Sequence, residues 1–232
     1  MPLAHAVVLV TGANRGIGLA FAREALARGA RVYAAARDPA TVQIPGALPI
    51  RLDVTDEDDV LRAARDCGDV THVINNAGVA AMGGFLADGA LDSARRQLEV
   101  NFFGPMRMAQ AFAPVLARNG GGAILNVLSI ASWLNRPMLG TYGATKSAAW
   151  ALTNGLRHEL RAQGTLVSAL HMGFVDTDLT KGIDMPKSSP EAIARYALDA
   201  LEAGAEEILA DEATRQVKLS LSSSAPAYLA AG

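Results

Sequence analysis

The chain has 232 residues, of which half are hydrophobic and 19% are charged, and its formal net charge is −2. Length alone would allow two domains, but it also fits one α/β domain, and we expect residues 1–232 to form a single domain with a flexible tail over 222–232. The near-neutral charge argues against a nucleic-acid partner or an anionic membrane surface. The absence of an 18-residue apolar run and of a signal-peptide pattern predicts a cytoplasmic protein with no membrane partner.

Two residue types limit the chemistry. Cys67 is the single cysteine, so no intrachain disulfide can form, and a reducing compartment is compatible with the sequence. The histidines show no metal-ligand spacing with Cys, Asp or Glu, and we therefore expect no metal site. These histidines are His5, His72, His158 and His171.

Apolar runs alternate with helical patterns along the whole chain. The expected strands are 6–10, 31–36, 48–52, 71–75, 123–128, 165–170 and 206–210, and the expected helices are 16–28, 56–66, 91–118, 141–163 and 190–203. Continuous apolar runs are typical of parallel strands buried on both faces. The alternation predicts an α/β fold with a parallel sheet and helices on both of its faces.

The first motif reads Thr-Gly-Ala-Asn-Arg-Gly-Ile-Gly over 11–18 and directly follows the apolar run Ala6 to Val10. A strand, a glycine turn and a helix in this order predict a phosphate-binding turn. Gly12 permits the turn, Gly16 lets the backbone approach a pyrophosphate, and Gly18 allows close packing of helix on strand. The N–H groups that begin the helix would point at the phosphates.

A second motif reads Tyr-Gly-Ala-Thr-Lys over 142–146, with Ser129 thirteen residues upstream. Tyr142 and Lys146 are four residues apart, so they lie on one face of a helix. A nearby ammonium would lower the pKa of the phenol from its usual value of about 10. Ser129 could then hold the same substrate oxygen. Taken alone, this spacing is weak evidence and favours an ordinary exposed helical pair, since such pairs occur by chance on many helices.

Further segments fall in a fixed order: Asp53-Val54, Asn75-Asn76-Ala77-Gly78, Asn101, and Gly173 to Thr177. Together with the first two motifs, they resemble the short-chain dehydrogenase/reductase family in its compact, single-domain, NADP-preferring form, over roughly residues 6 to 180. The resemblance implies a Rossmann-type, doubly wound, parallel seven-stranded sheet with strand order 3-2-1-4-5-6-7. One departure is Met172-Gly173, where the family usually has Pro-Gly beside the nicotinamide.

The resemblance also implies four catalytic residues. Tyr142 would be the general acid in carbonyl reduction, and Lys146 would lower its pKa and bind the nicotinamide ribose. Ser129 would position the substrate oxygen and stabilise developing charge. Asn101 would hold a water that links Lys146 to solvent, the alternative being an exposed mid-helix asparagine. The thirteen-residue spacing favours Ser129 over Ser132, which would line the pocket or cap the turn.

Charge indicates the cofactor. In such folds an acidic residue at the end of the second strand binds the ribose of NAD, but that position is Ala36. Arg15 and Arg37 would instead converge on a 2′-phosphate, although Asp38 is acidic and they could be ordinary surface arginines. We therefore expect NADP(H). Asp53 would bind the adenine amino group or cap a helix. The expected cofactor-binding residues are Gly12, Asn14, Arg15, Gly16, Ile17, Gly18, Arg37, Asp53, Val54, Asn75, Ala77, Gly78, Tyr142, Lys146, Gly173, Val175 and Thr177.

The predicted function is NADP(H)-dependent reduction of a carbonyl to an alcohol, or the reverse. The alternative is an NADP-binding sensor or scaffold without turnover, a class that tends to lose the Tyr or the Lys. The small-molecule substrate is expected to be a ketone or aldehyde that is apolar and uncharged around its carbonyl, and bulky or aromatic ketones could be admitted. Its pocket is expected at Ala81, Met82, Ala131, Trp133, Met138, Leu139, Phe174 and Leu179, with His171 nearby. Apolar faces on 91–118 and 141–163 predict a homodimer or homotetramer.

Overall fold

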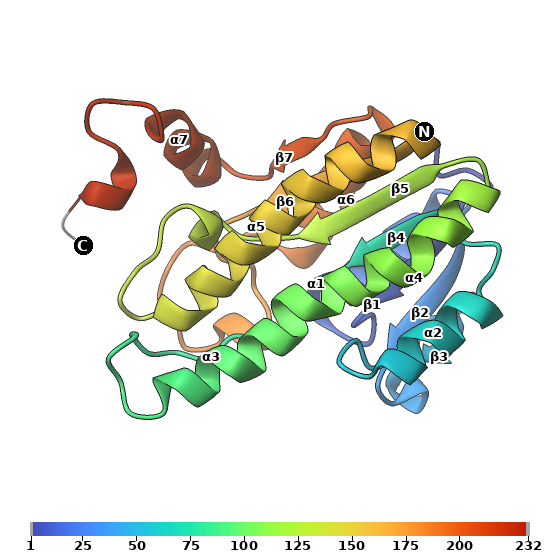
Figure 1. Cartoon of the computed structure of the whole chain (residues 1–232), viewed down its shortest axis with the longest axis horizontal. Coiled ribbons are helices and arrows are strands. Elements are labelled where there is room, and N and C mark those ends of the chain that lie inside the picture. The colour runs from blue at the N-terminus through green and yellow to red at the C-terminus, as the bar shows by residue number, and fades with distance from the viewer. Residues whose placement is uncertain (1, 231–232) are drawn as a thin grey trace.

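The computed structural model describes residues 2–230 and is organised around one parallel sheet (Figure 1). Within these residues the sheet has seven strands in the order β3-β2-β1-β4-β5-β6-β7, which confirms the order expected from the sequence. The strands are β1 (Val7–Thr11), β2 (Arg31–Ala36), β3 (Leu48–Arg51), β4 (His72–Asn75), β5 (Gly122–Val127), β6 (Thr165–His171) and β7 (Glu207–Leu209).

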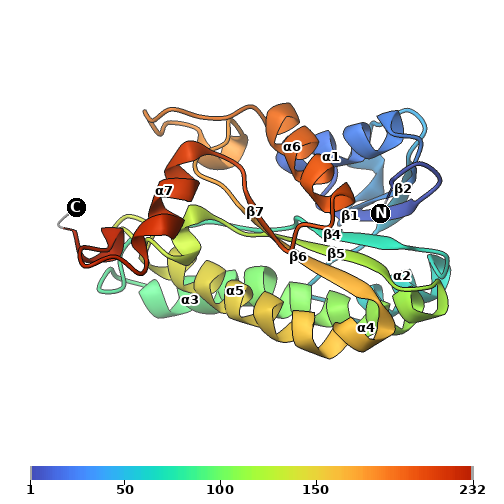
Figure 2. The same ribbon diagram turned by 90° about the horizontal axis from the view of Figure 1, so that it is seen from above.

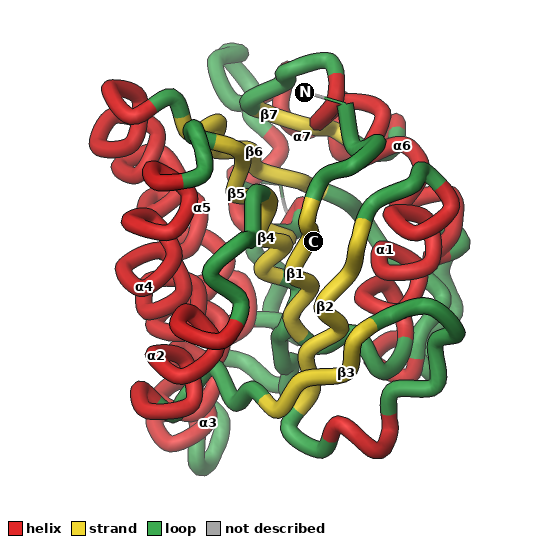
Figure 3. Tube along the Cα trace, turned by 90° about the vertical axis from the view of Figure 1, so that its right-hand side faces the viewer, coloured by secondary structure: helices red, strands yellow, loops and turns green. Residues whose placement is uncertain are grey.

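Helices cover both faces of the sheet (Figures 2 and 3). α1 (Gly16–Ala27) and α6 (Pro190–Glu202) pack together on one face. α2 (Glu57–Asp66), α4 (Gly104–Arg118) and α5 (Gly140–Leu160) lie on the other face, with α3 (Ala90–Leu98) leading into α4. The doubly wound arrangement is therefore the expected one.

The central strand explains the continuous apolar runs. In β1, Val8 and Val10 belong to the core beneath α1 and α6, whereas Leu9 belongs to the core beneath α2 and α4. All three are fully buried. Because successive side chains of a strand point to opposite faces, a strand covered on both sides must be apolar at every position.

The helix expected over 91–118 is not uniform. A π-helical segment, η2 (Glu99–Phe103), separates α3 from α4, and Gly104 N–H bonds the carbonyl of Glu99 five residues back. Pro105 supplies the reason: it has no N–H to donate to the carbonyl of Asn101, as a regular α-helix would require. Such π-helical turns are frequent at functional sites.

The C-terminal region holds elements that the sequence analysis did not predict. α7 (Glu212–Ser220) follows β7, and a short 3₁₀ turn, η6 (Ala227–Leu229), lies within the expected flexible tail over 222–232. Residues 231–232 of that tail lie outside the described residues. None of the helices described over 2–230 has the length and apolar character needed to cross a membrane.

The motif segments gather where the strands end. The glycine turn follows β1, Asn75 ends β4, Ser129 follows β5, and Met172 follows β6. β1 pairs with both β2 and β4, so the chain order reverses at β1. Open parallel sheets bind ligands outside the carboxyl ends of their strands at such a reversal point.

Candidate active site

The glycine turn has the backbone that its sequence predicts. Gly12 and Gly16 have φ angles of +66° and +55°, a region that other residues rarely adopt. A Cβ at Gly18 would lie 2.2 Å from the carbonyl oxygen of Gly12. The first turn of α1 can therefore pack against β1 only if residue 18 has no side chain.

Asn76 locks this turn from the neighbouring strand, a role that the sequence analysis missed. Its Nδ2 donates to the carbonyls of Thr11 and Gly12 at 2.9 and 3.2 Å. In return, the Thr11 hydroxyl oxygen accepts the N–H groups of Asn76 and Ala77 at 3.0 and 2.9 Å. The available signal was its place inside the Asn-Asn-Ala-Gly motif.

Asn75 is buried and stiffens the sheet. Its Nδ2 donates to Asn126 Oδ1 at 2.8 Å, and Asn126 Nδ2 donates to Thr153 Oγ1 at 2.9 Å, which links β4, β5 and α5. Within the described residues, Asn75 Oδ1 has no hydrogen-bond partner. Buried polar atoms are seldom left unpaired, so this oxygen has capacity for one more donor.

The N-terminus of α1 has no acceptor of its own. Arg15 occupies its N-cap position, and its side chain forms no capping hydrogen bond. By contrast, α2, α6 and α7 are capped by Asp56, Ser189 and Asp211. An uncapped helix that begins with a glycine turn suits an anionic group.

The two arginines expected at a 2′-phosphate lie in different surroundings. Arg15 forms an exposed ion pair with Asp178 at 3.1 Å, and Arg37 is exposed at the end of β2. Asp38 is turned into its own loop, where its Oδ1 accepts the N–H of Ala40 at 3.0 Å. Asn14 bonds Thr41 Oγ1 at 3.1 Å.

Asp53 and Val54 form a short turn before α2. Asp53 Oδ1 accepts the N–H and hydroxyl of Thr55 at 3.0 and 2.8 Å. Asp53 does not cap the helix, because Asp56 does so. Val54 is buried, and a Cβ at Gly104 would lie 2.9 Å from its Cγ2, so η2 and α4 pack directly on this turn.

Ser129, Tyr142 and Lys146 come together. Ser129 interacts with the hydroxyl of Tyr142 and lowers its pKa, and Lys146 Nζ lies 5.8 Å from the centre of the Tyr142 ring. Lys146 Nζ donates to the carbonyl of Val127 at 2.8 Å. Ser129 Oγ also accepts the N–H of Ala131 at 3.1 Å, which fixes the serine at the end of β5.

The expected lowering of the pKa of Tyr142 is wrong. Burial raises the pKa of Tyr142 to about 12, and the hydrogen bond from Ser129 offsets only part of that effect. Burial lowers the pKa of Lys146 to about 8. The reason is that Lys146 directs its ammonium at Val127, while both groups lose solvation.

Asn101 is buried on the π-helical turn. Its Nδ2 donates to the carbonyl of Val79 at 2.8 Å and to Thr145 Oγ1 at 2.9 Å, and its Oδ1 accepts the N–H of Val79 at 2.9 Å. The alternative of an exposed asparagine is therefore wrong. The side chain ties the segment after β4 to α5, one residue from Lys146.

The segment after β6 is held by several partners. Ile130 N–H donates to the carbonyl of Met172 at 2.8 Å, and Gly173 N–H donates to Asp211 Oδ2 at 2.6 Å. Val175 bridges to Ser188. A Cβ at Gly16 would lie 3.3 Å from Thr177 Cγ2, so this segment packs on the glycine turn.

Trp133 does not line the expected pocket. Its indole is buried, stacks on His171 with centroids 3.8 Å apart, and meets Trp150 edge-on at 6.0 Å. Lys218 of α7 lies 4.8 Å above the Trp133 ring. The sequence analysis read this residue as a pocket wall because it did not predict α7, which covers it.

His171 contacts the backbone of Ser129. Its Nδ1 lies 3.2 Å from the carbonyl of Ser129, and because a carbonyl only accepts, this bond places the proton on Nδ1. Burial lowers the pKa of His171 to about 4.

The other predicted pocket residues divide by exposure. Met82, Met138 and Leu179 are exposed, Ala81, Leu139 and Phe174 are half-buried, and Ala131 is buried. The segments 79–86 and 131–140 run together, since Gly83 N–H bonds the carbonyl of Met138 at 2.9 Å and Gly140 N–H bonds that of Gly83 at 3.1 Å.

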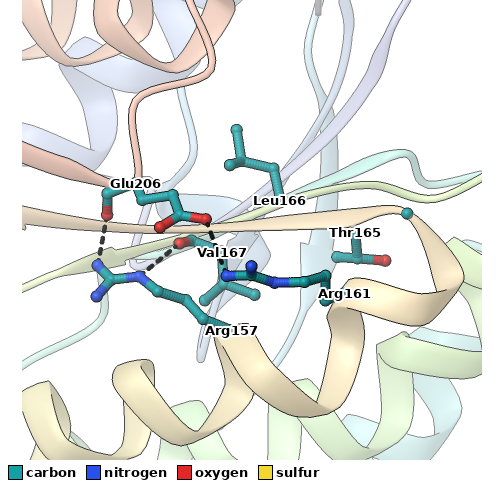
Figure 4. Close-up of a pocket in the computed structure, with 7 residues that line it drawn as sticks. Arg157, Arg161, Thr165, Leu166, Val167 and Glu206 are labelled. Atoms are coloured by element: carbon teal, nitrogen blue, oxygen red, sulfur yellow. Dashed lines mark hydrogen bonds and ion pairs between the residues drawn. The ribbon is translucent and has the colours of Figure 1, made fainter.

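A hollow elsewhere on the molecule is lined by arginines that connect neighbouring segments of the chain (Figure 4). Arg157 donates to the carbonyls of Val167 and Glu206, and Arg161 pairs with the Glu206 carboxylate at 3.6 Å. Thr165, where β6 begins, lines the same hollow. The hollow therefore lies at the amino end of β6, at the opposite end of the sheet from Ser129. Both of its arginines bond to other groups of the protein.

The fold is a Rossmann-type α/β fold with a doubly wound parallel sheet. A family model described as short chain dehydrogenase matches residues 6–187. The chain belongs to the short-chain dehydrogenase/reductase family.

Individual relatives agree with this assignment. An uncharacterized oxidoreductase of Schizosaccharomyces pombe is 35% identical over 69% of this chain and 57% of its own length. The short chain dehydrogenase tazN of Aspergillus terreus is 34% identical over 80% of this chain and 43% of its own. The chain thus spans about half the length of these two relatives.

Solved structures match over nearly the full chain. A short chain dehydrogenase from Burkholderia cenocepacia J2315 in complex with NADP has a TM-score of 0.93 and 35% identity, covering 97% of this chain and 95% of that one. A protein from Burkholderia phymatum in complex with NAD has a TM-score of 0.86 at 24% identity, covering 100% and 99%, a likeness that shows the fold alone.

Proposed function

We propose that this protein is an NADPH-dependent reductase of an apolar ketone or aldehyde, acting also in the reverse direction as an alcohol dehydrogenase, with residues 1–232 as one dinucleotide-binding and catalytic domain. The observation that carries the proposal is the convergence of Ser129, Tyr142 and Lys146 at the sheet edge that also holds the glycine turn. Retention of both Tyr142 and Lys146 favours turnover over the alternative, a sensor or scaffold that binds NADP without reaction.

The residues fit a dinucleotide. The uncapped start of α1 offers N–H groups to a pyrophosphate. Asn75 Oδ1 has capacity for a donor, and the close approach of backbone at Gly12 and Gly18 leaves the turn narrow. Arg15 and Arg37 would hold the 2′-phosphate of NADP(H), and the Burkholderia cenocepacia relative in complex with NADP supports that preference.

The roles of the reacting groups follow from their positions. When bound, the reduced nicotinamide supplies the hydride to the carbonyl carbon. Tyr142 Oη donates its proton to the carbonyl oxygen, and Ser129 Oγ holds that oxygen. Lys146 is buried with its pKa lowered to about 8 and directs its ammonium at Val127, so we assign it the binding of the nicotinamide ribose rather than a lowering of the Tyr142 pKa.

Tyr142→Phe tests the mechanism. We predict that kcat for NADPH-dependent ketone reduction falls by about 10²–10⁴-fold, the usual contribution of general acid–base catalysis. The Kd for NADPH should stay within about twofold, because the phenol contributes little to dinucleotide binding. A variant that keeps half of the parent activity would remove Tyr142 from the mechanism, and a parent that binds NADPH but reduces none of a panel of ketones, quinones, steroids and sugars would support the sensor alternative.

The oligomeric state and location also remain predictions. Phe103 on η2 is exposed, and Phe102, Met106 and Trp150 are half-buried on the helical face away from α1, which supports a homodimer or homotetramer through α4 and α5. On the same two helices, Ala109, Phe112, Ala149, Thr153 and Leu156 are buried within the chain, so these five residues do not contribute to such a surface. Light scattering that gives 24.1 kDa at micromolar concentration would contradict self-association. A cytoplasmic location is proposed on the sequence pattern.

A further inference from the structure

Asp211 joins two parts of the molecule that lie far apart in the sequence. Its Oδ1 caps α7 by accepting the N–H and hydroxyl of Thr214 at 2.8 and 2.7 Å. Its Oδ2 accepts the N–H of Gly173 at 2.6 Å. A single carboxylate therefore fixes both the start of α7 and the backbone that follows β6.

We infer that Asp211 is a positioning residue for the cofactor loop, Gly173–Thr177, which it holds in the shape that receives the nicotinamide half of the dinucleotide. The inference rests on the proposed function. Asp211 would act through the backbone of Gly173, so direct contact between Asp211 and the cofactor or substrate is not required.

Three features make this hydrogen bond more than a helix cap. Thr214 alone satisfies Oδ1, so a residue with one oxygen would suffice to cap α7. A Cβ at Gly173 would lie 3.3 Å from Oδ2, so the glycine lets the carboxylate approach its N–H. A bond between an ionised oxygen and a backbone N–H at 2.6 Å is of the strong, charge-assisted kind.

The sequence at residue 172 explains why the loop needs an outside anchor. The family pattern has proline at this position, which would fix φ of the backbone just before Gly173. Met172 imposes no such restriction, and its buried side chain belongs to the core beneath α6. Asp211 supplies a constraint at the next residue instead.

The rest of the loop connects Gly173, which Asp211 holds in place, to the glycine turn. Beyond Gly173, Asp176 N–H and Phe174 carbonyl pair with Ser188 at 2.9 Å each, and Thr177 packs on the glycine turn at Gly16. Figure 1 shows α7 beyond the carboxyl ends of β5 and β6, so its N-terminus is placed to hold the loop that leaves β6.

Asp211→Ser separates the two roles. Serine keeps a cap oxygen for Thr214 but has no second oxygen for Gly173. We expect the Kd for NADP⁺, measured by isothermal titration calorimetry, to rise about tenfold, which corresponds to the loss of about one charge-assisted hydrogen bond. The Kd for 2′-phospho-ADP-ribose, which lacks only the nicotinamide, should stay within twofold. Asp211→Asn, with one acceptor oxygen for two sets of donors, should shift NADP⁺ affinity in the same direction and serves if the serine variant does not fold.

Two variants of α7 provide matched controls. Thr214→Val removes a hydroxyl from the cap, and Val217→Ala removes buried methyl groups. Both should lower the melting temperature while leaving both ligand affinities within twofold. Equal weakening of NADP⁺ and 2′-phospho-ADP-ribose in Asp211→Ser, or no weakening of either, would overturn the inference. A parent protein that binds neither ligand would overturn the proposed function itself, and the inference with it.

Discussion

At the scale of single residues, small groups decide whether the phosphate turn can exist. Gly18 has no space for a side chain, and Asn76 uses its amide to hold two carbonyls of the turn. Both residues lie directly against backbone atoms of the turn, so a larger side chain at position 18 or a different side chain at position 76 would disturb the turn. By contrast, the arginines proposed at the 2′-phosphate are exposed, and their contribution depends on the ligand.

The two arginines give the first prediction at this scale. Replacing Arg15 and Arg37 together with alanine should weaken NADPH binding by about a hundredfold or more, since each of the two charge-assisted hydrogen bonds contributes roughly 1.5–3 kcal/mol. NADH, which lacks the 2′-phosphate, should be affected about twofold or less. Fluorescence titration of both cofactors measures the ratio.

Arg23 provides the control for net charge, because it is exposed on α1 and lies one turn beyond the glycine motif. Arg23→Ala should leave the NADPH-to-NADH preference of the parent unchanged. If the parent binds NADH as tightly as NADPH, the cofactor proposal fails. Asp178→Asn should tighten NADPH binding modestly, because it releases Arg15 from its ion pair.

At the scale of elements, the sequence predicted the strands and the cofactor turn well because their signals are local. Continuous apolar runs mark strands with two covered faces, and the glycine spacing requires positive φ angles within a few residues. The π-helical turn at Glu99–Phe103 was missed because it depends on how Pro105 breaks one hydrogen bond inside a long helical pattern.

The missed α7 had the larger effect on the site. Its sequence is short and polar, and its helical character rests on the Asp211 cap and on Thr214 and Val217 as buried positions. When α7 is not known, the sequence around Trp133 suggests that its indole lines an apolar pocket. With α7 in place, Lys218 covers that indole, and the aromatic ring becomes part of the support behind Ser129. Long-range packing of this kind has no local signal in one sequence.

At the scale of the whole molecule, two buried histidines link stability to pH. Burial lowers the pKa of both His72 and His171 to about 4. In the unfolded chain the usual value is about 6.5, so between these values the unfolded state binds more protons than the folded state. Their contribution to stability is fully present above pH 6.5 and is lost as the pH falls towards 4.

We therefore predict that each histidine accounts for about 2 kcal/mol of the stability lost between pH 8 and pH 5. Urea unfolding at the two pH values should show a smaller difference for His72→Gln and for His171→Gln than for the parent. His158 is exposed, and His158→Gln should leave the difference unchanged. Equal pH dependence in all four proteins would contradict the prediction.

The bare N-terminus of α1 couples stability to occupancy. A helix that keeps its first N–H groups for a ligand forgoes about 1 kcal/mol that a capping side chain would contribute. A bound ligand stabilises the folded state by mass action, by about 2.7 kcal/mol at a ligand concentration one hundred times Kd. NADPH should therefore raise the melting temperature by roughly 5–10 °C.

Arg15→Ser would reverse this trade-off, because serine at the N-cap accepts a hydrogen bond from the first turn. The empty protein should melt at a higher temperature than the parent, while the increase caused by NADPH should shrink. The glycine turn thus represents stability given up in the empty state in exchange for responsiveness to its ligand.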